Sequence, residues 1–204
     1  VEKDMYLPRI FWTQSNDGLC VMRMNRHQNK MELLVTDYVH ASPFNLPVVN
    51  MYTETSETYL DVAGDITFMT DGSFICLSER DGFRHLWWFN KDGSVKQQIT
   101  KGKWDIIDFY GFDTATLTAY YSSSAGGATQ KRVYASQIKK GKVQTEELSR
   151  DEGHSDAYFS EGYKYYIINH SSADIPPTVT LYDRGGKEIR VLKDNAILKS
   201  KLSN

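Results

Sequence analysis

The chain has 204 residues, of which 40% are hydrophobic and 25% charged, and its formal net charge is −2. This composition is ordinary for a globular protein, and the lack of a basic bias argues against nucleic acid as the main partner. No apolar run approaches the roughly 20 residues of a membrane-spanning helix, and the first residues do not resemble a signal peptide. Aromatic residues make up 13% of the chain and occur in short apolar runs, which indicates a sheet-rich core.

Short apolar runs alternate with turn clusters along the chain, and no long segment keeps a helical period. The runs form four sets of four, and each set predicts four strands. The first set covers 9–13, 19–24, 31–38 and 47–53, the second 65–70, 74–79, 85–90 and 95–100, the third 106–112, 117–122, 132–138 and 143–148, and the fourth 155–160, 164–169, 178–183 and 188–192.

The sets repeat with the period of a propeller blade. Aromatic residues of the first run, at 12, 68, 112 and 159, recur at about 45 to 55 residues. Most turns between the first two runs end on the glycine that a tight hairpin needs. We therefore predict an all-β chain, a β-propeller fragment of about four four-stranded antiparallel blades. The expected blades are approximately 5–57, 58–101, 102–150 and 151–195, and a linker toward a missing domain is expected at 196–204.

The stretch "GHSDAYFSEG", at 153–162, is close to the G-x-S-x-G pattern of many serine hydrolases. In a strand, however, His154 points to one face and Ser155 to the other, so these neighbours cannot form their own catalytic set. The surrounding residues also predict strand, turn and strand instead of the helix that should follow a nucleophile. We expect His154 and Ser155 to be structural residues at the crossover between two blades, where a side-chain hydrogen bond ties the crossover.

Two long stretches carry a family resemblance. The first, "SERDGFRHLWWFNKDGSVKQQITKGKWDI", has a polar S-x-R-D-G turn, an aromatic strand, a D-x-x-G hairpin and T-K-G-x-W. It resembles the propeller of the dipeptidyl peptidase IV family, in the prolyl oligopeptidase superfamily, whose bacterial members include the prolyl tripeptidyl peptidases. The second, "GHSDAYFSEGYKYYIINHSSADIPPTVTLYDRGGKEIRVLKDN", resembles the last blade of that propeller. The similarity extends from Tyr6 to about Asn195.

The resemblance implies a serine-type exopeptidase that removes di- or tripeptides from chains with proline near the amino terminus. In such enzymes an eight-bladed propeller caps an α/β-hydrolase domain that carries the catalytic triad. This sequence contains no G-x-S-x-G and ends about where that domain should begin. We therefore expect a non-catalytic half-propeller, inactive alone, that walls and gates the substrate chamber. The implied partners are the hydrolase domain of the same parent chain and the proline-containing peptide, with no cofactor, and the implied location is periplasmic or extracellular.

Two departures from the family concern its substrate contacts. The family binds the free amine of its substrate with paired glutamates on a short helix, but Glu146 and Glu147 fall in a predicted edge strand and are expected to be solvated. Some members place an aromatic residue and an arginine before the second blade, where this chain has "TYLDVAGD" with neither in register. Tyr59 and Asp61 are the remaining candidates to face the substrate chamber, although a structural role is open for both.

Several alternatives stay open. Propellers host many functions, so the chain could be a stand-alone interaction module that binds a protein or peptide through the loops around Arg80, Gly126 and Asp174. Trp87 and Trp88 could form a carbohydrate platform, but alternation places one ring on each sheet face and favours core packing. The five histidines show no metal spacing, so no metal site is predicted. Four blades of a larger ring would expose two apolar faces, and we expect self-association of the half-propeller, a tighter ring or aggregation.

Overall fold

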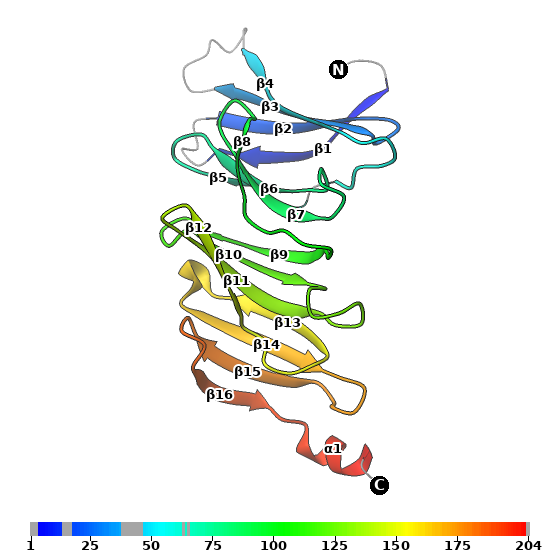
Figure 1. Ribbon diagram of the computed structural model, residues 1–204, viewed down its shortest axis with the longest axis vertical. Coiled ribbons are helices and arrows are strands. Elements are labelled where there is room, and N and C mark those ends of the chain that lie inside the picture. The colour runs from blue at the N-terminus through cyan, green and yellow to red at the C-terminus, as the bar shows by residue number, and fades with distance from the viewer. Residues whose placement is uncertain (1–3, 14–17, 38–46, 63, 65, 203–204) are drawn as a thin grey trace. The chain divides into compact units, whose positions relative to one another are not determined.

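The computed structural model describes residues 4–13, 18–37, 47–62, 64 and 66–202. Their strands form four separate four-stranded antiparallel sheets, and each sheet keeps its strands in chain order (Figure 1). The predicted all-β class, with four four-stranded antiparallel sheets and almost no helix, is confirmed and agrees with a propeller fragment. The chain divides into two units, Val1–Gln98 and Ile99–Asn204, which are described one at a time.

The first unit contains the first and second sheets. Every expected strand of this unit is present, and within each of the two sheets every strand pairs antiparallel with its neighbour in the chain. The strands are β1 Met5–Trp12, β2 Gly18–Asn25, β3 Lys30–Asp37, β4 Val48–Thr55, β5 Thr67–Phe68, β6 Phe74–Ser78, β7 His85–Phe89 and β8 Val95–Gln98. Residue 65, the first of the run that predicted β5, lies outside the described residues.

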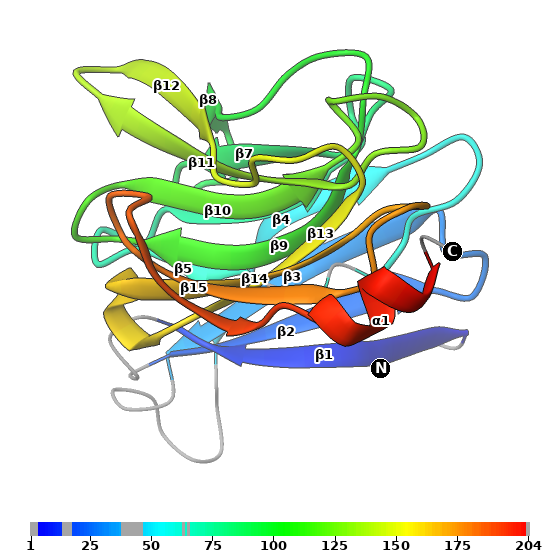
Figure 2. The same cartoon turned by 90° about the horizontal axis from the view of Figure 1, so that it is seen from below.

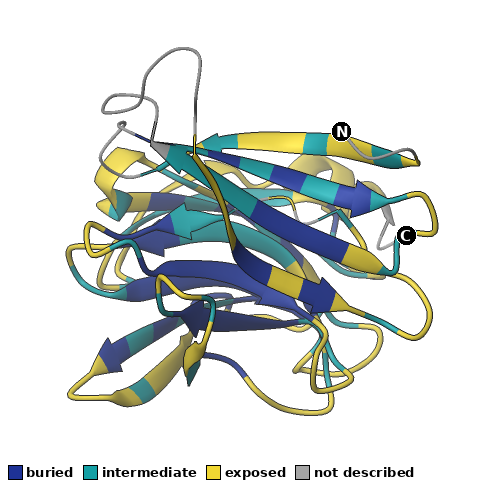
Figure 3. Cartoon of the chain, turned by 90° about the horizontal axis from the view of Figure 1, so that it is seen from above, coloured by how far each residue is buried: buried dark blue, intermediate teal, exposed yellow. Residues whose placement is uncertain are grey.

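The core of the first unit follows from strand alternation. In β2 every second residue is buried, and Cys20, Met22 and Met24 face the core because side chains alternate across a strand. Strands β6 and β7 are buried at every position. In Figure 3 most of the dark blue, buried segments of the chain lie on strands. The rings of Phe74 and Phe89 stack with centroids 5.1 Å apart, so aromatic packing holds the middle of this core.

The second unit contains the third and fourth sheets. The strands are β9 Ile106–Asp113, β10 Thr118–Ser123, β11 Arg132–Lys139, β12 Lys142–Glu147, β13 His154–Phe159, β14 Tyr165–Ser171, β15 Thr178–Asp183 and β16 Glu188–Lys193. The short 3₁₀ turn η1 covers Glu161–Tyr163. Between these two sheets lies an aromatic cluster in which the Tyr120 ring stacks on Tyr163 with centroids 4.8 Å apart and contacts the tilted ring of Phe159 at 4.6 Å.

A short helix follows the fourth sheet where a linker was expected. Helix α1 covers Ala196–Leu202 and follows β16 (red in Figures 1 and 2). The Asp194 carboxylate accepts a hydrogen bond from the Ala196 N–H at 3.1 Å, which satisfies one free donor of the first turn. The sequence after it contains alanine, leucine and lysine, which are good helix formers. No helix among the described residues is long and apolar enough to cross a bilayer.

Lys131 joins the third and fourth sheets of the second unit. Its backbone N–H donates to Gly153 O at 3.0 Å, and its carbonyl accepts from the Ser155 N–H at 2.8 Å. Its ammonium lies 2.6 Å from Asp108 Oδ2 and also bonds Asp156 Oδ1, although the lysine side chain is only 11% exposed. Burial alone would lower the pKa of Lys131, but the hydrogen bonds to the two carboxylates outweigh burial and raise it.

Candidate functional site

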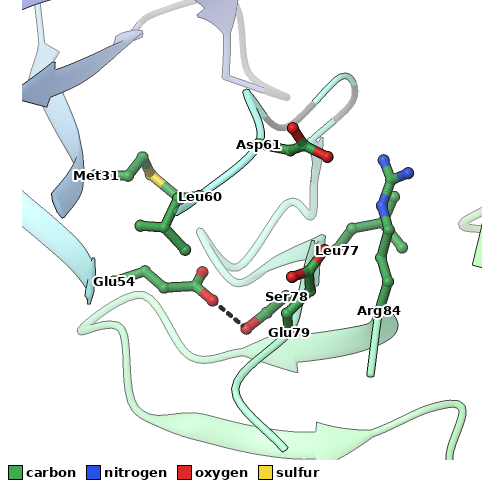
Figure 4. A pocket seen from close by; sticks show the side chains of 8 residues that line it. All are labelled: Met31, Glu54, Leu60, Asp61, Leu77, Ser78, Glu79 and Arg84. Carbon is green, nitrogen blue, oxygen red and sulfur yellow. Dashed lines mark hydrogen bonds between the residues drawn. The ribbon is translucent and has the colours of Figure 1, made fainter. Parts of the chain in front are cut away.

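A small cavity lies in the first unit, beside the ends of β4 and β6 (Figure 4). Its volume is about 30 Å³, which suits a water-sized group. Its wall combines apolar side chains with carboxylates and one guanidinium. The lining residues are Met31, Glu54, Leu60, Asp61, Leu77, Ser78, Glu79 and Arg84. A space of this size with polar groups in its wall can hold a water molecule or one small polar group.

Glu54 is the most buried carboxylate of this wall, with 6% of the residue exposed. Alternation along β4 places it on the same face as Tyr52. Its two oxygens accept hydrogen bonds from Tyr52 OH at 2.8 Å and from Ser78 Oγ at 2.5 Å (dashed in Figure 4 for Ser78). These hydroxyls satisfy a charge that would be costly to bury alone. Burial, and then the charge of Glu54, raise the pKa of Tyr52, so Tyr52 stays a neutral donor.

The structure separates the two residues predicted to face a substrate chamber. Asp61 is exposed and lines the cavity, and Figure 4 shows its carboxylate at the cavity rim. Tyr59 is 51% exposed and does not line it. Tyr59 lies instead near Tyr6 of β1, where burial and then Tyr59 raise the pKa of the Tyr6 hydroxyl. Contact of either residue with a substrate stays a prediction.

Sequence reasoning did not single out the other polar groups of the wall. Glu54 lies at the end of β4 in the first sheet, whereas Ser78 and Arg84 belong to the β6–β7 hairpin of the second sheet. The three residues therefore line one cavity only when the two sheets pack together. The one available signal is the alternating "YTE" of β4, which places Tyr52 and Glu54 on one face. The pattern does not predict that Ser78, 24 residues away in the sequence, contacts Glu54, because that contact depends on how the two sheets pack.

The second unit contains a serine–histidine pair at the predicted blade crossover. Register places Ser155 opposite His170 on the neighbouring strand, and Ser155 Oγ lies 2.9 Å from His170 Nδ1. Ser155 is completely buried, so its hydroxyl cannot reach a substrate, and burial lowers the pKa of His170. His154 is exposed, with Nδ1 4.0 Å from Asp156 Oδ2. The side chain of Ser155 thus bonds within its own sheet, and the expected side-chain tie across the crossover stays a prediction.

Comparison with known proteins decides the family. The sequence profile described as the dipeptidyl peptidase IV (DPP IV) N-terminal region matches residues 1–177. The chain belongs to this family. The family resemblance of the two motif stretches is therefore confirmed.

Solved structures agree with the assignment to the DPP IV N-terminal region. The crystal structure of Porphyromonas gingivalis dipeptidyl peptidase 4 aligns with 99% of this chain, with a TM-score of 0.85 and 33% identity, and the match covers 28% of that chain. A structure from Bacteroides ovatus aligns with 94% of this chain, with a TM-score of 0.74 and 22% identity, which supports the fold alone.

A curated relative extends the same result. Dipeptidyl peptidase 4 of Trichophyton equinum is 20% identical over 207 residues, which is 98% of this chain and 26% of that protein. The chain therefore spans about a quarter of the length of the relatives that it matches.

Proposed function

We propose that this chain is the non-catalytic propeller part of a serine exopeptidase that removes Xaa-Pro di- or tripeptides, and that it walls and gates the substrate chamber. The observation that carries the proposal is the family match over residues 1–177, supported by 33% identity to the Porphyromonas dipeptidyl peptidase 4. The chain contains no G-x-S-x-G, so an α/β-hydrolase domain of the same parent chain would supply the nucleophile.

Three further parts of the proposal concern the surroundings of the protein. The substrate would be a peptide with proline near its amino terminus. The source would be bacterial and the location periplasmic or extracellular. Self-association belongs here too, because exposed apolar side chains on sheet strands, such as Trp12, Ile10 and Val48 of the first sheet, favour burial against another sheet.

The cavity beside β4 and β6 gives the chamber wall its proposed chemistry. Carboxylates of Asp61 and Glu79 border a water-sized space whose floor includes the buried Glu54. Such a wall would hold a polar group of the peptide without taking part in bond cleavage. Residues of this kind bind substrate and transition state equally, so their loss raises KM and leaves kcat unchanged.

We expect Tyr59→Ala and Asp61→Asn, each introduced into the full product of the gene, to raise KM for Ala-Pro-p-nitroanilide about 3- to 10-fold, the cost of one lost polar contact. The kcat value should change by less than about twofold because neither side chain touches the reacting bond. Steady-state kinetics measures both constants. Matched controls in the second unit are Tyr165→Ala, whose tyrosine is 50% exposed, and Asp174→Asn. An unchanged KM for both chamber variants would remove these two residues from the chamber.

A further inference from the structure

Arg80 lies on a set of aromatic rings in the first unit. It belongs to the loop between β6 and β7, and its guanidinium carbon lies 5.0 Å from the ring centroid of Phe89, 5.4 Å from that of Trp87 and 5.8 Å from that of Tyr52. Trp87 and Phe89 are two residues apart on β7 and therefore face the same side. All three distances fall in the range of cation–π attraction.

The rings and one hydrogen bond hold the guanidinium in a defined place. Arg80 Nη2 donates to Tyr52 OH at 3.2 Å, and the Arg80 backbone N–H donates to Ser78 Oγ at 3.3 Å. Tyr52 and Ser78 are themselves anchored by the buried Glu54. An exposed arginine normally loses rotamer freedom when it binds a ligand. The contacts of Arg80 already restrict its rotamers before a ligand binds, so this entropy cost is smaller.

The same guanidinium keeps donors that no protein group uses. Among the described residues Arg80 has no ion pair, and its only side-chain hydrogen bond is the one to Tyr52, although an arginine carries five N–H donors. The residue is exposed, so these donors are open to solvent. Beneath it, Trp87 is nine-tenths buried and its Nε1 has no hydrogen-bond partner within the part of the chain that the structure describes. Arg80 and Trp87 thus have more N–H donors than the neighbouring acceptors use.

Local charges decide which acceptor suits this cluster. Glu54 accepts a hydrogen bond from Tyr52, and Glu79 and Asp81 flank Arg80 in the sequence. These carboxylates oppose the positive charge of Arg80, so long-range attraction of anions is weak. A planar guanidinium nevertheless matches a carboxylate with two parallel hydrogen bonds, and this match depends on geometry more than on net field. A rigid arginine with free donors on a solvent-facing loop is therefore best suited to bind a carboxylate.

We propose that Arg80, held on Tyr52, Trp87 and Phe89, is a recognition site for the carboxylate of an acidic peptide side chain. The site stands on these contacts alone and does not require peptidase activity. If the proposed function holds, the site lets the propeller prefer peptides with a glutamate or aspartate residue. A lysine cannot replace Arg80 in this role because it lacks the planar fork.

The test is an NMR titration of the 204-residue chain that follows the arginine Nε–H signals. The probes are acetyl-Ala-Glu-Ala-amide and acetyl-Ala-Gln-Ala-amide, which differ in one carboxylate. We expect the Arg80 signal to shift and saturate with the glutamate peptide, at a Kd at least about 5-fold below that of the glutamine peptide. Arg80→Lys should abolish this preference, whereas Arg26→Lys, an exposed arginine in a loop of the first sheet, should leave it intact.

Three results would overturn the proposal. Equal Kd values for the two peptides would show that the carboxylate is not recognised. No saturable shift of the wild-type Arg80 signal up to about 10 mM peptide would show that no site exists, whether or not the lysine variant folds. Inorganic phosphate that binds this signal more tightly than the glutamate peptide would assign a different ligand class. Because no step measures cleavage, failure of the proposed peptidase function would not affect the outcome.

Discussion

Replacing Phe74 with alanine should lower the free energy of unfolding of the first unit by about 3–5 kcal/mol, the usual cost of removing a large buried aromatic side chain. Phe74 is completely buried, and its ring contacts Phe89 at 5.1 Å and Tyr52 at 5.7 Å. Its loss would leave a cavity between the first two sheets, because the strands around it cannot close over the gap. Urea unfolding followed by tryptophan fluorescence measures the change.

The matched control is Val95→Ala on β8, in the same sheet. Val95 is 45% exposed, so its replacement should change the free energy of unfolding by less than about 0.5 kcal/mol. A Phe74→Ala protein that unfolds within about 1 kcal/mol of the wild type would contradict the aromatic core described for this unit.

Replacing Lys131 with methionine should lower the free energy of unfolding of the second unit by about 3 kcal/mol. This value is the lower end of the usual range for breaking a buried ion pair. The lower end applies because Asp108 and Asp156 are 43% and 36% exposed and regain water when the ammonium is lost. Without the ammonium, two carboxylates would face each other between the third and fourth sheets. Thermal unfolding monitored by circular dichroism measures the loss.

Lys139→Met is the control for the Lys131 variant. Lys139 is exposed at the far end of the same strand, β11, so its loss should be nearly neutral. Adding Asp156→Asn to Lys131→Met should recover part of the lost stability, since one uncompensated carboxylate is then removed. If the Lys131 and Lys139 variants had equal stability, the ion pairs of the Lys131 ammonium would not stabilise the contact between the two sheets.

The strands were predictable because the apolar runs and the turn residues between them indicate the same strand boundaries. β15 begins and ends at the residues predicted, 178–183, since a proline pair precedes it and a glycine pair follows it. β5 is shorter than its run because only Thr67 and Phe68 pair with β6. Helix α1 escaped prediction because seven residues are too few for periodicity to show.

The candidate sites were less predictable because they depend on how sheets pack. Asp61 was suggested by the family resemblance, not by a pattern in this chain. Arg80 was named only as part of a variable loop, and its contact with Tyr52 joins residues 28 positions apart. Alternation could place Trp87 and Phe89 on one face, but which side chain covers that face is decided by tertiary packing.

Hydrolysis of Ala-Pro-p-nitroanilide, measured for the full product of the gene and for the purified 204-residue chain, tests the proposed division of labour most directly. We expect the full product to cleave the substrate and the 204-residue chain to show no turnover above the uncatalysed rate. Turnover by the 204-residue chain alone, or a folded full product that cleaves no Xaa-Pro substrate, would contradict the assignment of a non-catalytic chamber wall.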